Sequence, residues 1–275
     1  MTRSRALVAL AVLLVACSGG NSGGDVEAES RAVPLVQSAA ARALRLPRMK
    51  PARVAPLVAT APAAMIRVLV TFAGTPVADT TVQARTIDPA CRESFVDTAV
   101  VHNGTAVAGA LVWVEGDASV FSSTGDGEHR PTVVMERCRL LPRVQLATPG
   151  STVQLVMHDS RVERLVVVPA SISAPIDTIA FNTDGQLVPL RNRADSAGVL
   201  GIYSTRLPWV RAFIAIAPAG VSAISDASGA ASFSVDRRAT KVTVRAWHPS
   251  LGIVAGSVNP SSAGAEPTIT LTFRR

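Results

Sequence analysis

Proline is the residue that most limits what this 275-residue chain can fold into. Eighteen prolines are spread along its length, from Pro34 to Pro267. Proline lacks a backbone donor and clashes with the preceding helical turn, so it is rare inside helices. Long helices are therefore excluded over most of the chain. Runs of β-branched residues between clusters of Gly, Pro, Asp and Ser predict strands instead, and the 48% of apolar residues argues against disorder.

Apolar and polar residues alternate in several of these runs, which is the pattern of a half-buried strand. The clearest cases are Val68, Val70 and Phe72, then Val153, Leu155 and Met157, and finally Ile269, Leu271 and Phe273. Turn signals separate the runs at residues 124–127, 182–185 and 226–229. The sequence therefore predicts an all-β protein, an antiparallel Greek-key β-sandwich with a smaller β module at its C-terminus and no helix of ordinary length after residue 65.

The first residues have the composition of an export signal. Arg3 and Arg5 precede the apolar stretch Ala6 to Ala16, which is too short to span a bilayer. The stretch ends in Leu14-Val15-Ala16-Cys17, which resembles the lipobox of bacterial lipoproteins. We expect residues 1–16 to be a lipoprotein signal peptide and Cys17 to be lipidated. The alternative is an ordinary signal peptide with a chance cysteine. By resemblance to Gram-negative sorting, Ser18 favours the outer membrane of a bacterial cell envelope.

Residues 17–64 are interpreted as a flexible tether, rich in Gly, Ala, Pro and Arg, with one short helix expected over Val36 to Leu46. A flexible chain of this length spans about 40 Å, enough to hold a domain clear of the membrane. The tether includes a basic cluster that could meet anionic headgroups, although a solvated linker is the favoured reading. The cluster comprises Arg42, Arg45, Arg48, Lys50 and Arg53.

The net charge does not indicate a nucleic-acid partner. The chain has 27 basic and 20 acidic residues, so the net charge is +7, falling to +5 without Arg3 and Arg5. Aromatic residues make up only 4%, and no basic run contains interleaved aromatics on which bases could stack. We therefore expect no nucleic-acid binding.

The chain has three cysteines, and we expect Cys17 to have a different role from the other two. With Cys17 assigned to the lipid, Cys91 and Cys138 remain in an exported, oxidising setting, where two thiols more often form a disulfide than stay free. We therefore predict the disulfide Cys91–Cys138. A metal ligand or a free buried thiol is the alternative for either residue.

A series of short motifs follows in order between residues 66 and 256. They are Ile87–Cys91, Val100–Gly104, Ala110–Gly116, Cys138–Val144, Pro149–Val153, Met157–Asp159, Pro208–Ile214, Ser225–Phe233 and Val244–His248. In order and spacing the series resembles exported cupredoxin-like proteins, often called plastocyanin-like or methylamine-utilisation proteins. The stretch from Pro208, for example, is similar to their P-W-M-R-A-Y-I. This resemblance implies a cupredoxin-like sandwich over residues 65–217.

The resemblance fails at the residues that would bind copper. The family's ligands are a His in an upstream loop and the Cys, His and Met of a C-x-x-H-x-x-M loop. Here these positions fall on Glu163, Ser204, Leu207 and Val210. A blue-copper centre depends on a thiolate, whereas a serine hydroxyl is a hard, neutral donor and Leu has no lone pair. We therefore expect no copper and no other cofactor. As a hypothesis from the alignment, Glu163 and Arg206 form an ion pair in place of the metal.

The remaining polar candidates favour structural roles. His102, His129, His158 and His248 are widely separated, with no spacing that pre-organises a metal site. The run His158-Asp159-Ser160 suggests a triad, but adjacent residues at a strand end diverge and cannot form one relay. Trp113, Trp209 and Trp247 are expected in the core, with a sugar-stacking platform as the alternative.

The C-terminal residues 218–275 resemble a carboxypeptidase-regulatory-like β module, an accessory fold without catalytic residues. Together these expectations describe a non-enzymatic, lipid-anchored envelope protein, a binding or structural accessory on a copper-free cupredoxin-like scaffold. Its partners would be the membrane, through the lipid, and an unknown envelope protein or glycan. The alternatives are an electron carrier that holds copper through unusual ligands, a carbohydrate-binding module and, least favoured, a hydrolase.

Overall fold

The computed structural model describes residues 63–274, apart from positions 76–77, 92, 116–130, 160, 171, 173, 191–197, 218–219 and 262–265. The predicted signal peptide, Cys17, the tether up to residue 62 with its expected helix, and His129 all lie outside the described residues. Within them the protein is almost entirely β, as the sequence predicts. The helix that the structure describes, α2 (Ala84–Ile87), has four residues, and among the described residues no helix is long and apolar enough to cross a membrane.

The first of two sandwiches is formed by two sheets packed face to face. One sheet has the order β13 (Leu187–Pro189), β10 (Gln154–Met157), β7 (Thr132–Glu136), β8 (Arg139–Leu141). The other has the order β12 (Asp177–Phe181), β11 (Glu163–Pro169), β14 (Gly198–Ser204), β15 (Arg211–Ile216), β9 (Val144–Ala147). Alternate residues of both sheets, such as Leu155 and Met157 on β10 and Leu165 and Val167 on β11, fill a shared core.

The second sandwich combines strands from both ends of the described chain. One sheet consists of β17 (Ala230–Asp236), β1 (Ala63–Ala73), β5 (Ala106–Val107) and β4 (His102–Asn103), with β20 (Thr268–Arg274) paired to β1. The other has the order β16 (Ser222–Ile224), β6 (Leu111–Glu115), β18 (Val242–His248), β19 (Gly252–Val258). The predicted alternation holds here, because Val68, Val70 and Phe72 of β1 point into the core with Leu271 and Phe273 of β20.

The predicted boundary between residues 217 and 218 is therefore wrong as a division of the sheets. Strand β1 pairs antiparallel with β17 and parallel with β20, and β6 pairs with β18. Residues 63–115 thus belong with the C-terminal strands, and the first sandwich is inserted between β6 and β16. Periodicity could not show this, since it reveals which face of a strand is buried and not which strand lies beside it.

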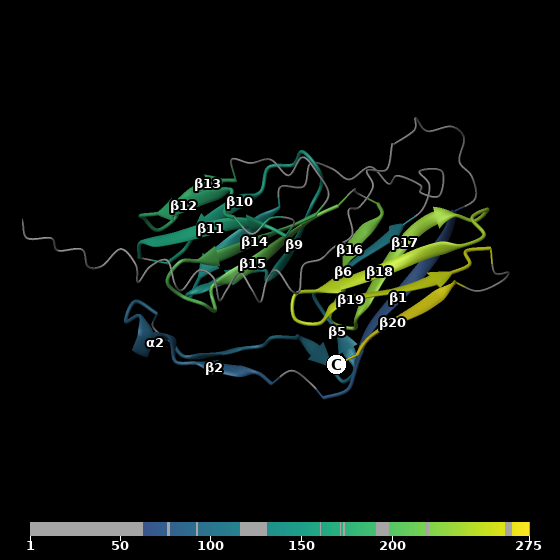
Figure 1. Ribbon diagram of the computed structural model, residues 1–275, viewed down its shortest axis with the longest axis horizontal. Coiled ribbons are helices and arrows are strands. Elements are labelled where there is room, and N and C mark those ends of the chain that lie inside the picture. The colour runs from purple at the N-terminus through teal and green to yellow at the C-terminus, as the bar shows by residue number, and fades with distance from the viewer. Residues whose placement is uncertain are drawn as a thin grey trace, which may run out of the picture.

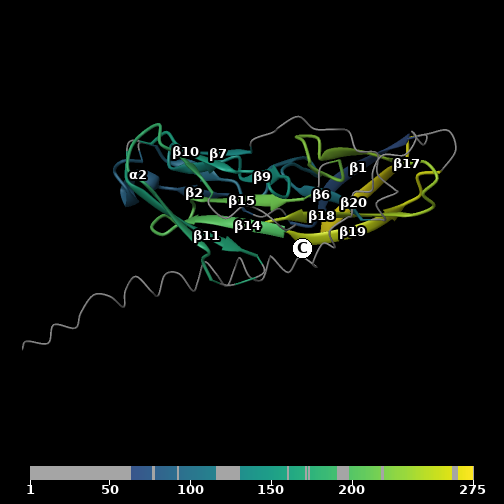
Figure 2. The same ribbon diagram turned by 90° about the horizontal axis from the view of Figure 1, so that it is seen from above.

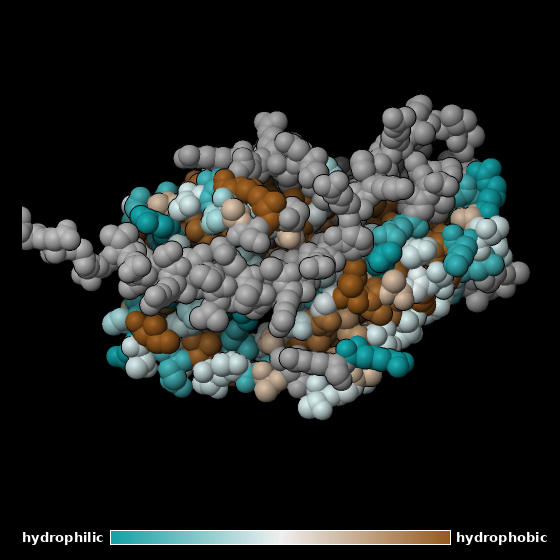
Figure 3. Space-filling view, in the orientation of Figure 1, coloured by the Kyte–Doolittle hydropathy of each residue, from teal (hydrophilic) through white to brown (hydrophobic). Residues whose placement is uncertain are grey.

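The two sandwiches lie side by side along the long axis (Figures 1 and 2). They meet through a third apolar cluster, which joins Leu111, Trp113 and Trp247 of the second sandwich to residues of the first. Phe213 lies edge-on to Trp247, with ring centroids 5.7 Å apart, and Tyr203 lies edge-on to Phe213 at 6.0 Å. On the outer surface, hydrophobic residues are exposed at several places among hydrophilic ones on the face shown in Figure 3.

One segment leaves the second sandwich to cover the first. Between β1 and β4, residues 80–97 form β2 (Thr80–Val82), α2 and β3 (Phe95–Asp97), which extend along the first sandwich (Figure 1). We call residues 80–97 the strap. Val82, Ala84 and Cys91 contribute to the core of the first sandwich, although the chain on either side of the strap belongs to the second.

Candidate functional site

The four positions that align with copper ligands come together in space. Ser204 ends β14 and pairs with Leu165 of the adjacent β11, which begins at Glu163. The Ser204 N–H donates to the Val210 carbonyl oxygen at 2.9 Å, and the Val210 N–H donates to the Leu207 carbonyl oxygen at 2.9 Å. A tight connection between β14 and β15 thus holds Ser204, Leu207 and Val210 beside Glu163. All four residues are buried.

The Ser204 hydroxyl organises this connection. Its oxygen donates to Glu163 Oε1 at 2.6 Å and accepts the N–H groups of Arg206 and Leu207 at 3.0 and 2.9 Å. A hydroxyl provides one donor and two acceptor lone pairs, so these three contacts satisfy it completely. Ser204 therefore stabilises the loop and has no free lone pair for a metal.

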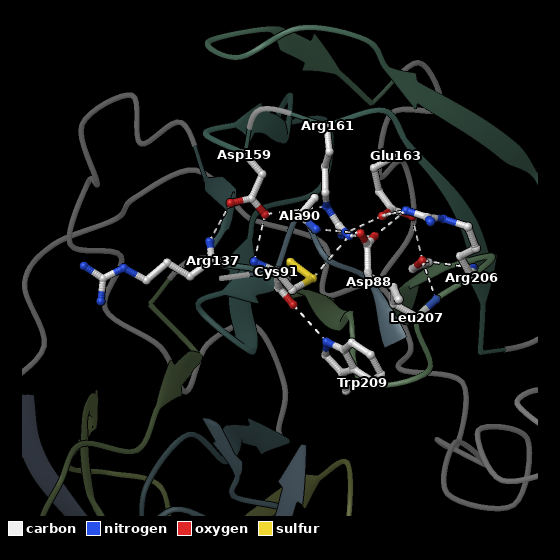
Figure 4. The surroundings of a disulfide bond; sticks show 12 residues. Asp88, Ala90, Cys91, Arg137, Asp159, Arg161, Glu163, Arg206, Leu207 and Trp209 are labelled. Atoms are coloured by element: carbon white, nitrogen blue, oxygen red, sulfur yellow. Dashed lines mark hydrogen bonds and ion pairs between the residues drawn. A yellow bond between two sulfur atoms is a disulfide. The ribbon is translucent and has the colours of Figure 1, made fainter. Parts of the chain in front are cut away.

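Glu163 belongs to a network of charged groups at this end of the sandwich (Figure 4). Its Oε2 lies 2.6 Å from Arg161 Nη2 and 3.8 Å from Arg206 Nη2. The strap completes the network, because Asp88 Oδ2 accepts from Arg161 Nη1 and from Arg206 Nη2, each at 2.8 Å. The structure thus places Arg206 beside Glu163, where the alignment suggested an ion pair, but it adds the shorter contacts of Arg161 and Asp88.

Burial and charge act in opposite directions on Asp88. Burial by itself raises the pKa of this carboxyl, whereas the Ala90 N–H and the positive charges of Arg161 and Arg206 lower it. The lowering effects prevail, so the pKa of Asp88 lies below its usual value. The carboxylate remains charged at neutral pH, as its position between two guanidinium groups requires.

Asp159 connects the network to the disulfide. Its two oxygens accept the N–H groups of Arg137 and Cys138 at 2.7 and 2.8 Å. Both of those residues have positive φ, 50° and 58°, a conformation that side chains disfavour and that these two hydrogen bonds help to hold. Asp159 Oδ2 also lies 3.8 Å from Arg161 Nε.

The predicted disulfide between Cys91 and Cys138 is confirmed, with the two Cα atoms 5.7 Å apart and a sequence separation of 47. In the chain-entropy account, closing a loop of this size stabilises the folded state by about 4 kcal/mol. Arg161 Nη1 lies 3.5 Å from Cys91 Sγ, and the Cys138 carbonyl accepts from Trp209 Nε1 at 3.1 Å. The disulfide therefore joins the strap to the charged network.

This set of residues does not fit a copper ion. Leu207 and Val210 offer no side-chain donor, Ser204 is fully hydrogen-bonded, and Glu163 faces the guanidinium of Arg161. A buried positive charge at the same place opposes a cation. Among the described residues, no group of three or more His, Cys, Asp or Glu side chains could hold a metal ion.

The described histidines do not join the network. His158 is half-exposed, with Nδ1 3.8 Å from Asp184 Oδ1, and Nδ1 of His102 lies 3.2 Å from the Gly104 carbonyl oxygen. His248 is buried and its Nδ1 accepts the Ser250 N–H at 3.2 Å. Burial, with the charge of Arg143 as a second cause, lowers the pKa of His248 to about 4.

The three tryptophans lie in the core, as predicted. Trp113, Trp209 and Trp247 have exposed fractions of 2%, 7% and 0%, so none of them presents a face on which a sugar could stack. Trp209 packs at the end of the first sandwich, edge-on to Phe95 of the strap with ring centroids 6.4 Å apart.

A second ion-pair cluster was not apparent from the sequence. Asp97, at the end of the strap, is buried between Arg143 and Arg211, with Arg211 Nη2 3.2 Å from Asp97 Oδ2. These residues are far apart in the chain and carry no motif. The only available signal for the strap was the disulfide, which places the residues around Cys91, including Asp88, near Cys138.

No protein-family model and no curated protein matches this chain. Solved structures similar to part of it include copper proteins. The copper-containing nitrite reductase of Thermus scotoductus SA-01 is 17% identical, with a TM-score of 0.28, covering 36% of this chain and 25% of that one. The purple cupredoxin of Nitrosopumilus maritimus is 14% identical, with a TM-score of 0.27, covering 31% and 98%. A reduced form of amicyanin is 14% identical, with a TM-score of 0.29, covering 38% and 98%.

Proposed function

We propose that this chain is a non-enzymatic, lipid-anchored protein of a bacterial cell envelope, which acts as a binding or structural accessory on a copper-free cupredoxin-like scaffold. The observation that carries the proposal is the state of the four aligned positions. Glu163, Ser204, Leu207 and Val210 converge as a ligand set would, yet their polar atoms bind one another, Arg161 and the loop backbone. The geometry supports a site that now stabilises the protein.

Electron transfer through other ligands is the first competing function. It would require a thiolate or imidazoles grouped around one point. The two described cysteines are joined in a disulfide, and the described histidines have unrelated surroundings. The part of the chain that the structure describes therefore offers a copper ion neither a thiolate nor a group of imidazoles.

A hydrolytic function would require a nucleophile activated by a neighbouring base. The buried Ser204 hydroxyl donates to Glu163, whose carboxylate is in turn neutralised by Arg161 at 2.6 Å. A carboxylate held by a guanidinium is a weak base, and a nucleophile at this depth cannot reach a substrate. Ser204 is thus better suited to holding the loop than to catalysis.

Attachment by lipid is supported by the sequence alone. The apolar stretch before Leu14-Val15-Ala16-Cys17 and the Gly- and Ser-rich residues after it are typical of a lipidated N-terminus followed by a linker. Labelling with a radioactive fatty acid should mark the full chain and not Cys17→Ser. Equal labelling of both would rule out the anchor at Cys17.

Metal content tests the copper-free scaffold. Residues 17–275 carrying Cys17→Ser are purified, loaded with Cu(II), and compared with a variant in which four ligands are restored: Glu163→His, Ser204→Cys, Leu207→His and Val210→Met. We expect the unrestored protein to retain no stoichiometric copper by mass spectrometry and to lack the blue-copper absorption near 600 nm. Stoichiometric copper with that band in the unrestored protein would overturn the proposal. A band in the restored variant alone would show that the positions still have copper-site geometry.

A further inference from the structure

The strap is attached to the first sandwich in an unusual way. Among the strands that the structure describes, its β2 and β3 pair only with each other, as a two-stranded sheet separate from those of both sandwiches. Its described backbone hydrogen bonds stay within the strap, for example from the Asp88 N–H to the Ala84 carbonyl oxygen. No backbone ladder among the described residues fixes the strap to the body of the protein, so side chains alone hold it.

Two kinds of non-covalent contact attach these side chains. Asp88 lies between Arg161 and Arg206 at one point, and Asp97 lies between Arg143 and Arg211 at another. Val82, Ala84 and Phe95 supply the packing contacts, and Phe95 lies edge-on to Trp209 with its ring centroid 4.9 Å from the Arg139 guanidinium carbon. Buried ion pairs lose much of their attraction to the cost of removing both charges from water. The non-covalent attachment is therefore weak for a segment of this length.

The remaining attachment is covalent. The disulfide joins Cys91, between the two charged anchors of the strap, to Cys138, between β7 and β8 of the first sandwich. It lies directly beside the charged network, since Arg161 contacts both Asp88 and Cys91 Sγ. Its formation confines Asp88 close to Arg161 and Arg206, which raises their effective concentration and favours the closed arrangement.

We propose that the strap is a lid over the Glu163–Ser204 end of the first sandwich, and that oxidation of Cys91 and Cys138 holds it closed. In the dithiol form the strap detaches and reattaches, which uncovers Trp209 and the Arg161–Glu163 pair. Closure forms one S–S bond. The two thiols release two protons, and their two electrons reduce the disulfide of an external oxidant to a dithiol. The inference does not depend on the absence of copper, so the two can fail separately.

The strap contains a trypsin cleavage site, Arg85, that can report whether the strap is attached. Arg85 is exposed within α2. Trypsin can cleave after Arg85 only when the strap around it unfolds locally and enters the active site of the protease. Two forms of residues 17–275 with Cys17→Ser are compared: the disulfide form and the variant Cys91→Ser/Cys138→Ser. We expect cleavage after Arg85 to be at least tenfold faster in the variant, while the amides of β1 and β14 stay protected from hydrogen exchange.

A matched control separates the disulfide from the ion pairs. Asp88→Asn in the disulfide form removes a charged anchor but keeps the covalent one, so cleavage should accelerate less than threefold. Equal cleavage in the disulfide and serine forms would overturn the proposal, because the strap would then be held by packing. Complete loss of exchange protection in β14 would overturn it too, because the first sandwich itself would then be unfolded without the disulfide. Cleavage in Asp88→Asn as fast as in the serine variant would show that the ion pairs, not the disulfide, hold the lid.

If the serine variant does not fold, the folded disulfide form is reduced with dithiothreitol and the same cleavage and exchange measurements are made. The expected result is unchanged. Cleavage after Arg85 that is no faster in the reduced protein than in the disulfide form would overturn the proposal, since the dithiol strap would then stay attached.

Discussion

Two contacts between distant parts of the chain differ sharply in chemistry. The interface between the sandwiches is apolar and aromatic, built on Trp113, Trp247 and Phe213. The contact between strap and first sandwich is charged, built on Asp88, Arg161 and Glu163 beside a disulfide. The burial of apolar surface stabilises the folded state wherever the two surfaces fit together. For a buried ion pair, the cost of removing both charges from water nearly cancels their attraction, so the pair mainly determines which groups meet. The first contact should therefore provide stability, and the second should define position.

The largest effect is expected at the apolar interface. Trp247→Ala removes a fully buried indole that lies edge-on to Phe213, which should lower the free energy of unfolding by about 4 kcal/mol. Denaturant unfolding measures the change. Val101→Ala, at a residue that is 58% exposed, serves as the control and should change stability by less than about 0.5 kcal/mol. A loss below about 1 kcal/mol for Trp247→Ala would mean that the interface is not a true core.

A slightly smaller loss is expected when the charged network is broken on one side. Arg161→Met leaves the buried Glu163 without its shortest cationic partner and leaves Asp88 paired with Arg206 alone, and an uncompensated buried charge costs about 3 kcal/mol. Adding Glu163→Gln to this variant should recover part of the loss, because it removes the orphaned charge. Failure to recover any stability would show that Arg161 acts through packing and not through charge.

Acid should destabilise the protein through His248. The folded pKa is about 4, below the value of 6.5 for an unperturbed histidine, because the ring is buried near Arg143. Between pH 6.5 and 4, the unfolded state therefore binds a proton at His248 that the folded state does not bind. Stability is fully present above pH 6.5 and is lost as the pH falls towards 4, by on the order of 3 kcal/mol. The depressed pKa of Asp88 adds a loss only below its unfolded pKa of 3.8.

Unfolding measured at several pH values checks this window. His248→Asn should flatten the slope between pH 6.5 and 4, whereas a substitution at the exposed His102 should leave the slope intact. An unchanged slope in His248→Asn would assign the acid sensitivity to another group.

The smallest effect concerns the ion pair suggested by the alignment. Arg206 Nη2 lies 3.8 Å from Glu163 Oε2, and the Arg206 side chain is 56% exposed. Solvent screens such a pair, so a double-mutant cycle of Glu163→Gln and Arg206→Gln should give a coupling below about 1 kcal/mol. The corresponding cycle for Arg161 and Glu163 should give a larger value. The reverse ranking would contradict the network described here.

The sequence allowed several features to be predicted in advance. Alternation in β1 and β20 identified buried Val70 and Leu271 because a strand turns alternate residues to opposite faces. The disulfide followed from the number of cysteines and the expected oxidising compartment. The loop from Ser204 to Val210 was found by its motif spacing, and its neighbour Glu163 by alignment. All of these are local patterns or short lists with few alternatives.

Other features were decided only in three dimensions. The sequence by itself determined that the chain is a β protein, where several of its strands lie, and that the aligned positions lack a soft metal donor. Tertiary structure decided that β1 joins the C-terminal strands, that the strap crosses to the other sandwich, and that Asp88 reaches Arg161 across 73 residues. Strand pairing and buried ion pairs depend on which groups, far apart in the sequence, are buried against each other. The periodicity of residues along the chain does not contain that information.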